Sequence, residues 1–129
     1  MSTVAPFLVI PFTVLLFALA VLQILLIVGM PLGRFAWGGT QDRLSPSRRI
    51  AAGVAIVLYA AFVVIALLRS HVIATPLSDL VGIIAMWVVT SYLFFSVVPN
   101  LASKSPQEKR LMVPVSAALA ILALLIALS

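Results

Sequence analysis

Long apolar runs alternate with short polar segments along the chain. Each run is close to the roughly 20 residues that an α-helix needs to cross the hydrocarbon core of a bilayer. The runs contain no acidic or basic side chain. The pattern predicts a single all-α domain over residues 1–129, a polytopic membrane protein built as a four-transmembrane-helix bundle, with helices at about 7–30, 50–68, 80–98 and 111–128. The first run lacks the basic leader of a signal peptide, so we expect it to be retained.

Proline and hydroxyl residues mark the ends of these runs. The first run stops before Pro31 and the third before Pro99, because proline does not readily continue a helix. Three hydroxyl–proline pairs predict helix starts, since the hydroxyl can cap backbone N–H groups and proline suits the first helical position. These pairs are Ser45-Pro46, Thr75-Pro76 and Ser105-Pro106. Glu108 follows Ser105 at the spacing of a capping box.

The composition requires lipid around much of the chain. Of the 129 residues, 64% are hydrophobic and 9% are charged. A soluble domain is about 45–50% apolar and about 25% charged, so an ordinary soluble domain is excluded. The chain contains no cysteine, which excludes disulfides, thiolate catalysis and cysteine metal sites.

The basic residues indicate an orientation in the membrane. Seven of the 8 Lys and Arg residues lie after the first and third runs, at Arg34, Arg43, Arg48, Arg49, Lys104, Lys109 and Arg110. Cytoplasmic loops are enriched in Lys and Arg, so these gaps are expected to face the cytoplasm, with the termini N-out/C-out. The net charge of +5 then suits a membrane surface and not nucleic acid. The seven residues are topology signals alone, or they also bind anionic phospholipid headgroups.

Small residues predict where the helices pack. Helices in lipid associate through close packing at small side chains and through hydrogen bonds. The last run carries such a seam at spacings of four, three and four residues, formed by Ser116, Ala120, Ala123 and Ala127. We expect this face to point into the bundle or into a partner subunit.

Polar side chains inside the runs form a second feature. From their rise along each helix, they are expected to lie near the middle of the membrane or slightly toward its cytoplasmic side. They are Gln23, Tyr59, Thr90, Ser91, Tyr92 and Ser116. Two interpretations stay open: interhelical hydrogen bonds that stabilise the bundle, or a polar pathway or small ligand site.

The sequence contains no convincing motif for catalysis or metal binding. His71 is the only histidine, and a single imidazole without an acidic cluster does not make a metal site. A His–Asp relay would have to use His71 and Asp79, both in a short outer loop. We therefore expect no enzyme activity, no cofactor and no metal.

The most distinctive segment is the first cytoplasmic gap, Pro31-Leu32-Gly33-Arg34-Phe35-Ala36-Trp37-Gly38-Gly39. Its glycines allow tight turns, Arg34 can reach lipid phosphate, and Trp37 suits the headgroup interface. Trp37 is either an interfacial anchor or part of a surface that recognises a lipid headgroup or a partner protein.

This segment, with Asn100–Ser105 and Glu108-Lys109-Arg110 through Pro114-Val115, resembles an uncharacterised family of small four-span bacterial membrane proteins. Members carry PLGRxAWGG-like and NxxSxSxxER-like cytoplasmic loops, and here Lys109 stands between the Glu and the Arg of the second motif. The likeness covers essentially the whole chain. It implies a multi-pass protein of the bacterial cytoplasmic (inner) membrane and supplies no activity.

The sequence favours a non-enzymatic structural or accessory membrane protein that packs against a membrane protein partner or against itself as a homo-oligomer. One alternative is a small homo-oligomeric transporter, although the predicted spans lack the acidic residue that proton-coupled antiporters of this size use. A second alternative is a protein that binds anionic lipid through its basic loops.

Overall fold

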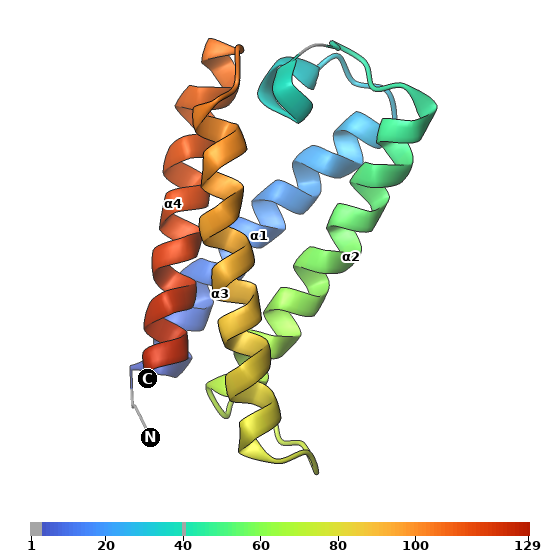
Figure 1. The fold of residues 1–129 in the computed structure, drawn as a ribbon. Coiled ribbons are helices and arrows are strands. Elements are labelled where there is room, and N and C mark those ends of the chain that lie inside the picture. Colours follow the sequence, from blue (N-terminus) through green and yellow to red (C-terminus); the bar gives the residue numbers. More distant parts are fainter. Residues whose placement is uncertain (1–3, 40) are drawn as a thin grey trace.

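The computed structural model describes residues 4–39 and 41–129 and confirms an all-α, four-helix membrane architecture (Figure 1). The helices are α1 (Ala5–Ile27), α2 (Pro46–Arg69), α3 (Asp79–Leu101) and α4 (Pro106–Leu128). Two short 3-10 helices, η1 (Gly33–Phe35) and η2 (Trp37–Gly39), lie between α1 and α2. Each α-helix has 23 or 24 residues and is apolar enough to cross a membrane.

Two of the three hydroxyl–proline pairs begin helices as predicted, and the third does not. Pro46 and Pro106 are the first residues of α2 and α4, and Ser105 accepts a hydrogen bond from the Glu108 backbone N–H. The prediction for Thr75-Pro76 was wrong. Thr75 Oγ1 instead accepts a bond from Leu77 N in a turn, and α3 begins later, at Asp79.

The helices also end differently from the predicted ranges. The first helix stops at Ile27, three residues early, where Gly29 adopts φ +96° and turns the chain. The third helix continues through Pro99 to Leu101. Proline removes one backbone donor there, but only two residues of helix follow Pro99, so a kink at this point displaces little of α3.

The helices form two hairpins, α1–α2 and α3–α4, that pack closely over only half of their length. Figure 1 shows them together near the α2–α3 turn and apart near η1 and η2. We call the end with η1, η2 and the α3–α4 turn the loop end. The main apolar core lies in the other half, where its largest fully buried side chains are Phe12, Leu16, Met86, Leu119 and Ile126.

The α4 seam explains why the hairpins meet in that half. Ala120 and Ala123 are fully buried and Ala127 is 4% exposed, all within the main core. Side chains this small allow neighbouring backbones to approach closely. Toward the loop end the same face of α4 continues with Ser116, the last residue of the seam, and with the larger Met112, and there the hairpins separate.

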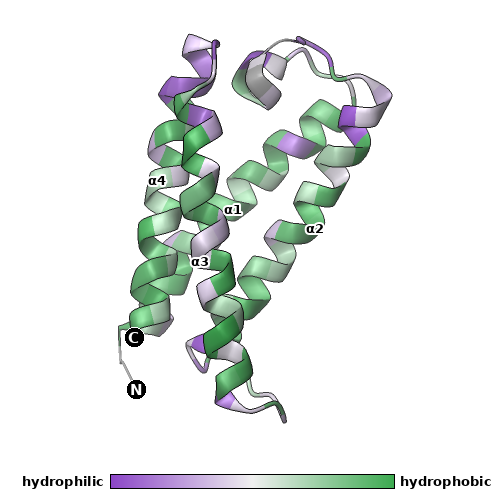
Figure 2. Cartoon of the chain, in the orientation of Figure 1, coloured by the Kyte–Doolittle hydropathy of each residue, from purple (hydrophilic) through white to green (hydrophobic). Residues whose placement is uncertain are grey.

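The outside of the bundle is apolar along the helices and hydrophilic mainly at the loop end (Figure 2). Phe7, Phe17 and Phe95 are each at least 70% exposed. A surface this rich in exposed large apolar side chains is stable only in contact with lipid. The chain is therefore a multi-pass membrane protein.

Candidate ligand cavity

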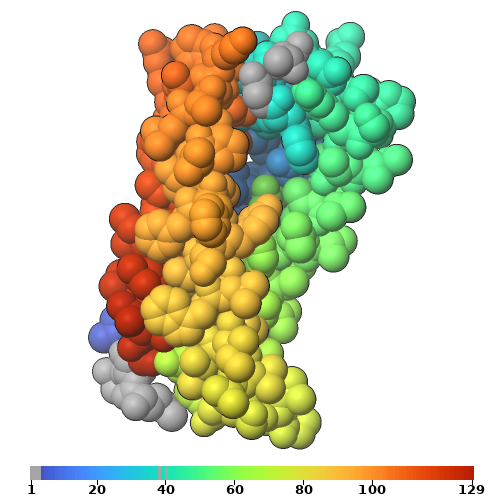
Figure 3. Space-filling view, in the orientation of Figure 1, coloured from blue at the N-terminus to red at the C-terminus, as the bar shows by residue number. Residues whose placement is uncertain are grey.

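A cavity of about 210 Å³ lies between the two hairpins, in the half of the bundle nearer the loop end. All four helices and the η1–η2 segment contribute to its wall. Figure 3 shows the hollow on the side of the molecule, between α3 and the α2–loop region. Its polar and aromatic lining consists of Gln23, Trp37, Tyr59, Tyr92, Ser96, Asn100, Glu108 and Ser116.

Regular spacing places this lining on one face of each helix. Tyr92, Ser96 and Asn100 are four residues apart on α3, as are Glu108, Met112 and Ser116 on α4. Residues at this spacing share a helix face, and eight residues of helix span about 12 Å. The polar wall therefore runs along the bundle for about two helical turns.

The serine hydroxyls of the α3 and α4 wall donate within their own helices, and so does one N–H of Asn100. Ser96 Oγ donates to Leu93 O over 2.6 Å and Ser116 Oγ to Met112 O over 2.6 Å. Asn100 Nδ2 donates to Ser96 O over 3.0 Å. A hydroxyl has only one proton but two lone pairs, so what these serines present to the cavity is acceptor capacity.

The η1–η2 segment covers the cavity at the loop end. Trp37 Nε1 donates to Gln23 Oε1 over 3.3 Å, and Ser105 Oγ donates to Arg34 O. Gly39 lies so close to α4 that a Cβ placed on it would be 2.3 Å from Ser105 Cβ. Trp37 has φ +55°, a conformation that bulky residues rarely adopt unless their surroundings enforce it.

Ser96, Asn100 and Glu108 line this cavity but were not part of the predicted polar layer, and Glu108 is the acidic residue among them. Its side chain is 3% exposed and lines the cavity beneath the covering segment. We interpreted Glu108 only as a capping-box partner, because it lies outside the apolar run at 111–128. Glu108 lies eight residues before Ser116, which is two steps of four residues along the same helix face. This spacing is the sequence signal that could have placed Glu108 beside the predicted polar residues.

Four of the six residues of the predicted polar layer line the cavity, and two do not. Gln23, Tyr59, Tyr92 and Ser116 line the cavity. Thr90 is buried elsewhere and donates to Met86 O over 2.8 Å. Ser91 is exposed on the far side of α3, where it donates to Trp87 O over 2.9 Å.

Three of the arginines predicted to contact lipid donate hydrogen bonds to backbone carbonyl oxygens in and around the first loop. Arg43 Nε donates to Gly29 O over 3.1 Å, Arg48 Nη1 to Trp37 O over 3.1 Å, and Arg49 Nε to Leu44 O over 3.0 Å.

The other basic residues of the loop end are more open to the surroundings. The Arg34 guanidinium stacks 4.9 Å above the Phe35 ring. Lys104, Lys109 and Arg110 are exposed. Contact of these side chains with anionic lipid stays a prediction.

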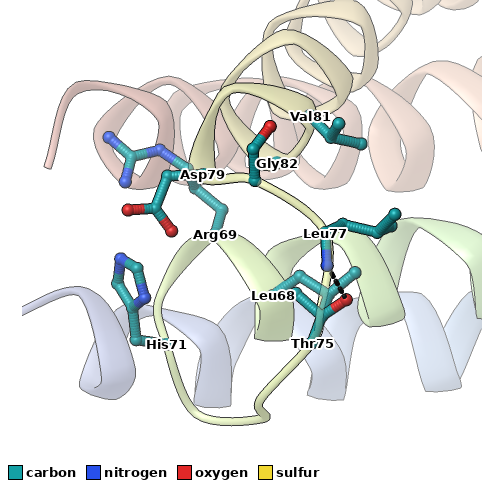
Figure 4. A pocket seen from close by; sticks show the side chains of 9 residues that line it. Leu68, Arg69, His71, Thr75, Leu77, Asp79, Val81 and Gly82 are labelled. Atoms are coloured by element: carbon teal, nitrogen blue, oxygen red, sulfur yellow. Dashed lines mark hydrogen bonds between the residues drawn. The ribbon is translucent and has the colours of Figure 1, made fainter.

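A second cluster of charged side chains lies at the opposite end (Figure 4). Arg69 Nη2 donates to the carbonyl oxygens of Ala127 and Ser129, which joins the end of α2 to the end of α4. In Figure 4 the Asp79 carboxylate lies between Arg69 and His71, beside a cavity of about 30 Å³. That space is about the size of one water molecule. Among residues 4–39 and 41–129, no group of three or more His, Asp or Glu side chains could hold a metal ion.

The fold and the cavity together define a multi-pass membrane protein with a polar cavity that opens on the side of its helix bundle. Comparison of the chain with known protein families, with curated proteins and with solved structures finds no match.

Proposed function

We propose that this chain is a non-enzymatic protein of the bacterial cytoplasmic membrane that binds the polar group of a small molecule in the cavity between its hairpins. The observation that carries the proposal is the convergence of polar side chains from every helix on one space of about 210 Å³. Ligand sites are mostly apolar clefts with a few polar groups that converge. Leu19, Leu93 and Leu119 supply apolar wall here beside the polar lining.

The bilayer is the natural source of such a molecule. The hollow lies on the side of the bundle, and Tyr92 at its wall is 50% exposed. The covering segment occupies the loop end. A molecule with an apolar tail could leave its tail in lipid while its polar group enters between α2 and α3.

Filling the cavity tests this proposal. The variant Ser96→Trp places an indole in the cavity wall, whereas Ser91→Trp places it on the outer surface of the same helix. We expect a small molecule to copurify with the wild-type protein and with Ser91→Trp, and to be reduced about tenfold or more in Ser96→Trp. Mass spectrometry of organic extracts of the three purified proteins measures this. If all three retain the same molecules, or none retains any, the proposal fails.

We further propose that the loop end faces the cytoplasm, because seven of the 8 basic residues lie in its two connections or within the first five residues of α2 and α4. The natural chain has no cysteine, so single-cysteine variants report topology directly. A membrane-impermeant maleimide should label Ile73→Cys in intact cells and Ala102→Cys only after permeabilisation. Both positions are exposed. The reverse labelling pattern would contradict this orientation.

Packing against a partner or a second copy remains an alternative proposal with less support. The small-residue seam that suggested it is buried within a single chain at Ala120, Ala123 and Ala127. A homo-oligomeric transporter would use the same cavity, and the copurified molecule would then be its substrate.

A further inference from the structure

Three aromatic side chains and one acidic side chain share the cavity wall. Trp37 comes from η2, Tyr59 from α2, Tyr92 from α3 and Glu108 from α4. Aromatic faces attract cations through their quadrupole, most strongly when the cation is removed from water, and such aromatic surfaces recognise quaternary ammonium groups. A buried acidic group in the same wall would supply the counter-charge.

The rest of the wall also favours a positive ligand. The Ser96 and Ser116 hydroxyl protons are bonded to their own helices, which leaves acceptor lone pairs toward the cavity. Among the residues that the structure describes, the lining contains no Lys, Arg or His. Among these described residues of the lining, the only charged side chain is the acidic Glu108, so an anionic headgroup would find no positive partner there.

The aromatic residues are held before any ligand arrives. Tyr92 packs on Phe62 with ring centres 5.4 Å apart and planes tilted by 55°. Trp37 is fixed by its bond to Gln23, whose side chain also interacts with the Tyr59 hydroxyl. A wall fixed in advance loses less side-chain freedom on binding, which increases affinity.

We propose that the cavity binds the ammonium group of an organic cation, with Glu108 as its counter-charge and Trp37, Tyr59 and Tyr92 as aromatic surfaces. This inference rests on the proposed function and names the chemical class of the ligand. The ammonium group could belong to a free amine or to the headgroup of a lipid such as phosphatidylcholine.

Choline and its neutral isostere test the charge requirement. The chain has 2 tryptophans, and Trp87 lies on the outer face of α3, so the Trp87→Phe variant reports Trp37 alone. In this variant, reconstituted in phosphatidylglycerol vesicles, choline should change the Trp37 emission saturably. The isostere 3,3-dimethylbutan-1-ol has the same shape without the charge and should require a concentration at least about tenfold higher.

Two substitutions test the residues in the same background. Glu108→Gln keeps the shape of the side chain but replaces one acceptor oxygen with an NH2 donor and removes the negative charge. It should weaken choline binding about tenfold or more. If that variant does not fold, Tyr59→Leu and Tyr59→Phe give an independent test. The ring is kept in Tyr59→Phe, which loses only the hydroxyl that interacts with Gln23, and is lost in Tyr59→Leu. Tyr59→Leu should therefore bind choline several-fold more weakly than Tyr59→Phe does.

A phosphatidylcholine arm distinguishes the two sources of the ammonium group. If the lipid is the ligand, adding phosphatidylcholine to the vesicles should shift the Trp37 emission and remove the response to choline. If a free cation is the ligand, phosphatidylcholine should leave that response intact.

Equal binding of choline and its isostere would overturn the inference. It would also be overturned if choline gave no saturable response in vesicles with or without phosphatidylcholine and the lipid itself caused no shift in the Trp37 emission. Loss of a copurified molecule in Ser96→Trp would in that case leave the proposed function standing with a ligand of another class. Failure of the copurification test as well would remove both.

Discussion

Replacement of Gly33 by Ala is expected to release the first loop from the bundle. A Cβ at this position would lie 1.5 Å from Gln41 O and 2.6 Å from Gln41 C, and both are backbone atoms. The Gly33 N–H donates to Asp42 O over 2.8 Å, so the loop segments around Gly33 and Asp42 are held together at this point. Because backbone cannot give way locally, Gly33→Ala must separate them, at a cost of about 1–3 kcal/mol.

Trypsin measures this release, since Arg34 and Arg43 both lie in the loop. Each 1.4 kcal/mol by which opening becomes easier raises the population of the open form about tenfold, and cleavage should rise with it. Gly53→Ala is the matched control, because nothing lies within 4 Å of the Cβ it would add on α2. That variant should keep wild-type resistance and gain up to about 1 kcal/mol of helix stability. Equal trypsin resistance of Gly33→Ala and the wild-type protein would show that the loop does not dock in this way.

The helices were predictable because their determinants are local. An apolar run of sufficient length has few alternatives in a bilayer, and the prolines at Pro46 and Pro106 mark two of the starts. Thr75-Pro76 has the same pattern but begins no helix. The hydroxyl of Thr75 closes a turn on Leu77 N instead, and Ser78 with Asp79 provides the next N-terminus.

The cavity was only partly predictable because it depends on how far the two hairpins separate. Depth along the membrane placed Gln23, Tyr59, Tyr92 and Ser116 at similar levels, and the structure brings these four together. Depth alone could not show which way each side chain points, so Ser91 was grouped with Tyr92 although it lies on the outer surface.

The covering loop and Glu108 depend on contacts between distant segments. Ser105 reaches Arg34 O across 71 residues of sequence, and no local pattern encodes that bond. Without it, Glu108 would be the first-turn residue of a helix at the membrane surface. Its burial follows from the loop that covers it, which is why sequence reasoning assigned it only a capping role.

The variant Ala123→Phe is expected to destabilise the bundle more than a phenylalanine on the outward face of α4 does. Ala123 is 0% exposed and belongs to the main core where the hairpins meet. A phenyl ring there has no free space and must push a neighbouring helix away, with a cost of about 1–3 kcal/mol for overpacking. Separation of the helices would also expose the adjacent Ala120 and Ala127 contacts that depend on close approach.

Leu125→Phe provides the comparison on the same helix, since Leu125 is 44% exposed and its side chain faces outward. Titration of both detergent-solubilised variants with sodium dodecyl sulfate, followed by circular dichroism, should show a lower unfolding midpoint for Ala123→Phe and a wild-type midpoint for Leu125→Phe. Equal midpoints would mean that the small residues of α4 do not set the distance between the hairpins. The narrow half of the bundle, and with it the divergence that forms the cavity, would then need another cause.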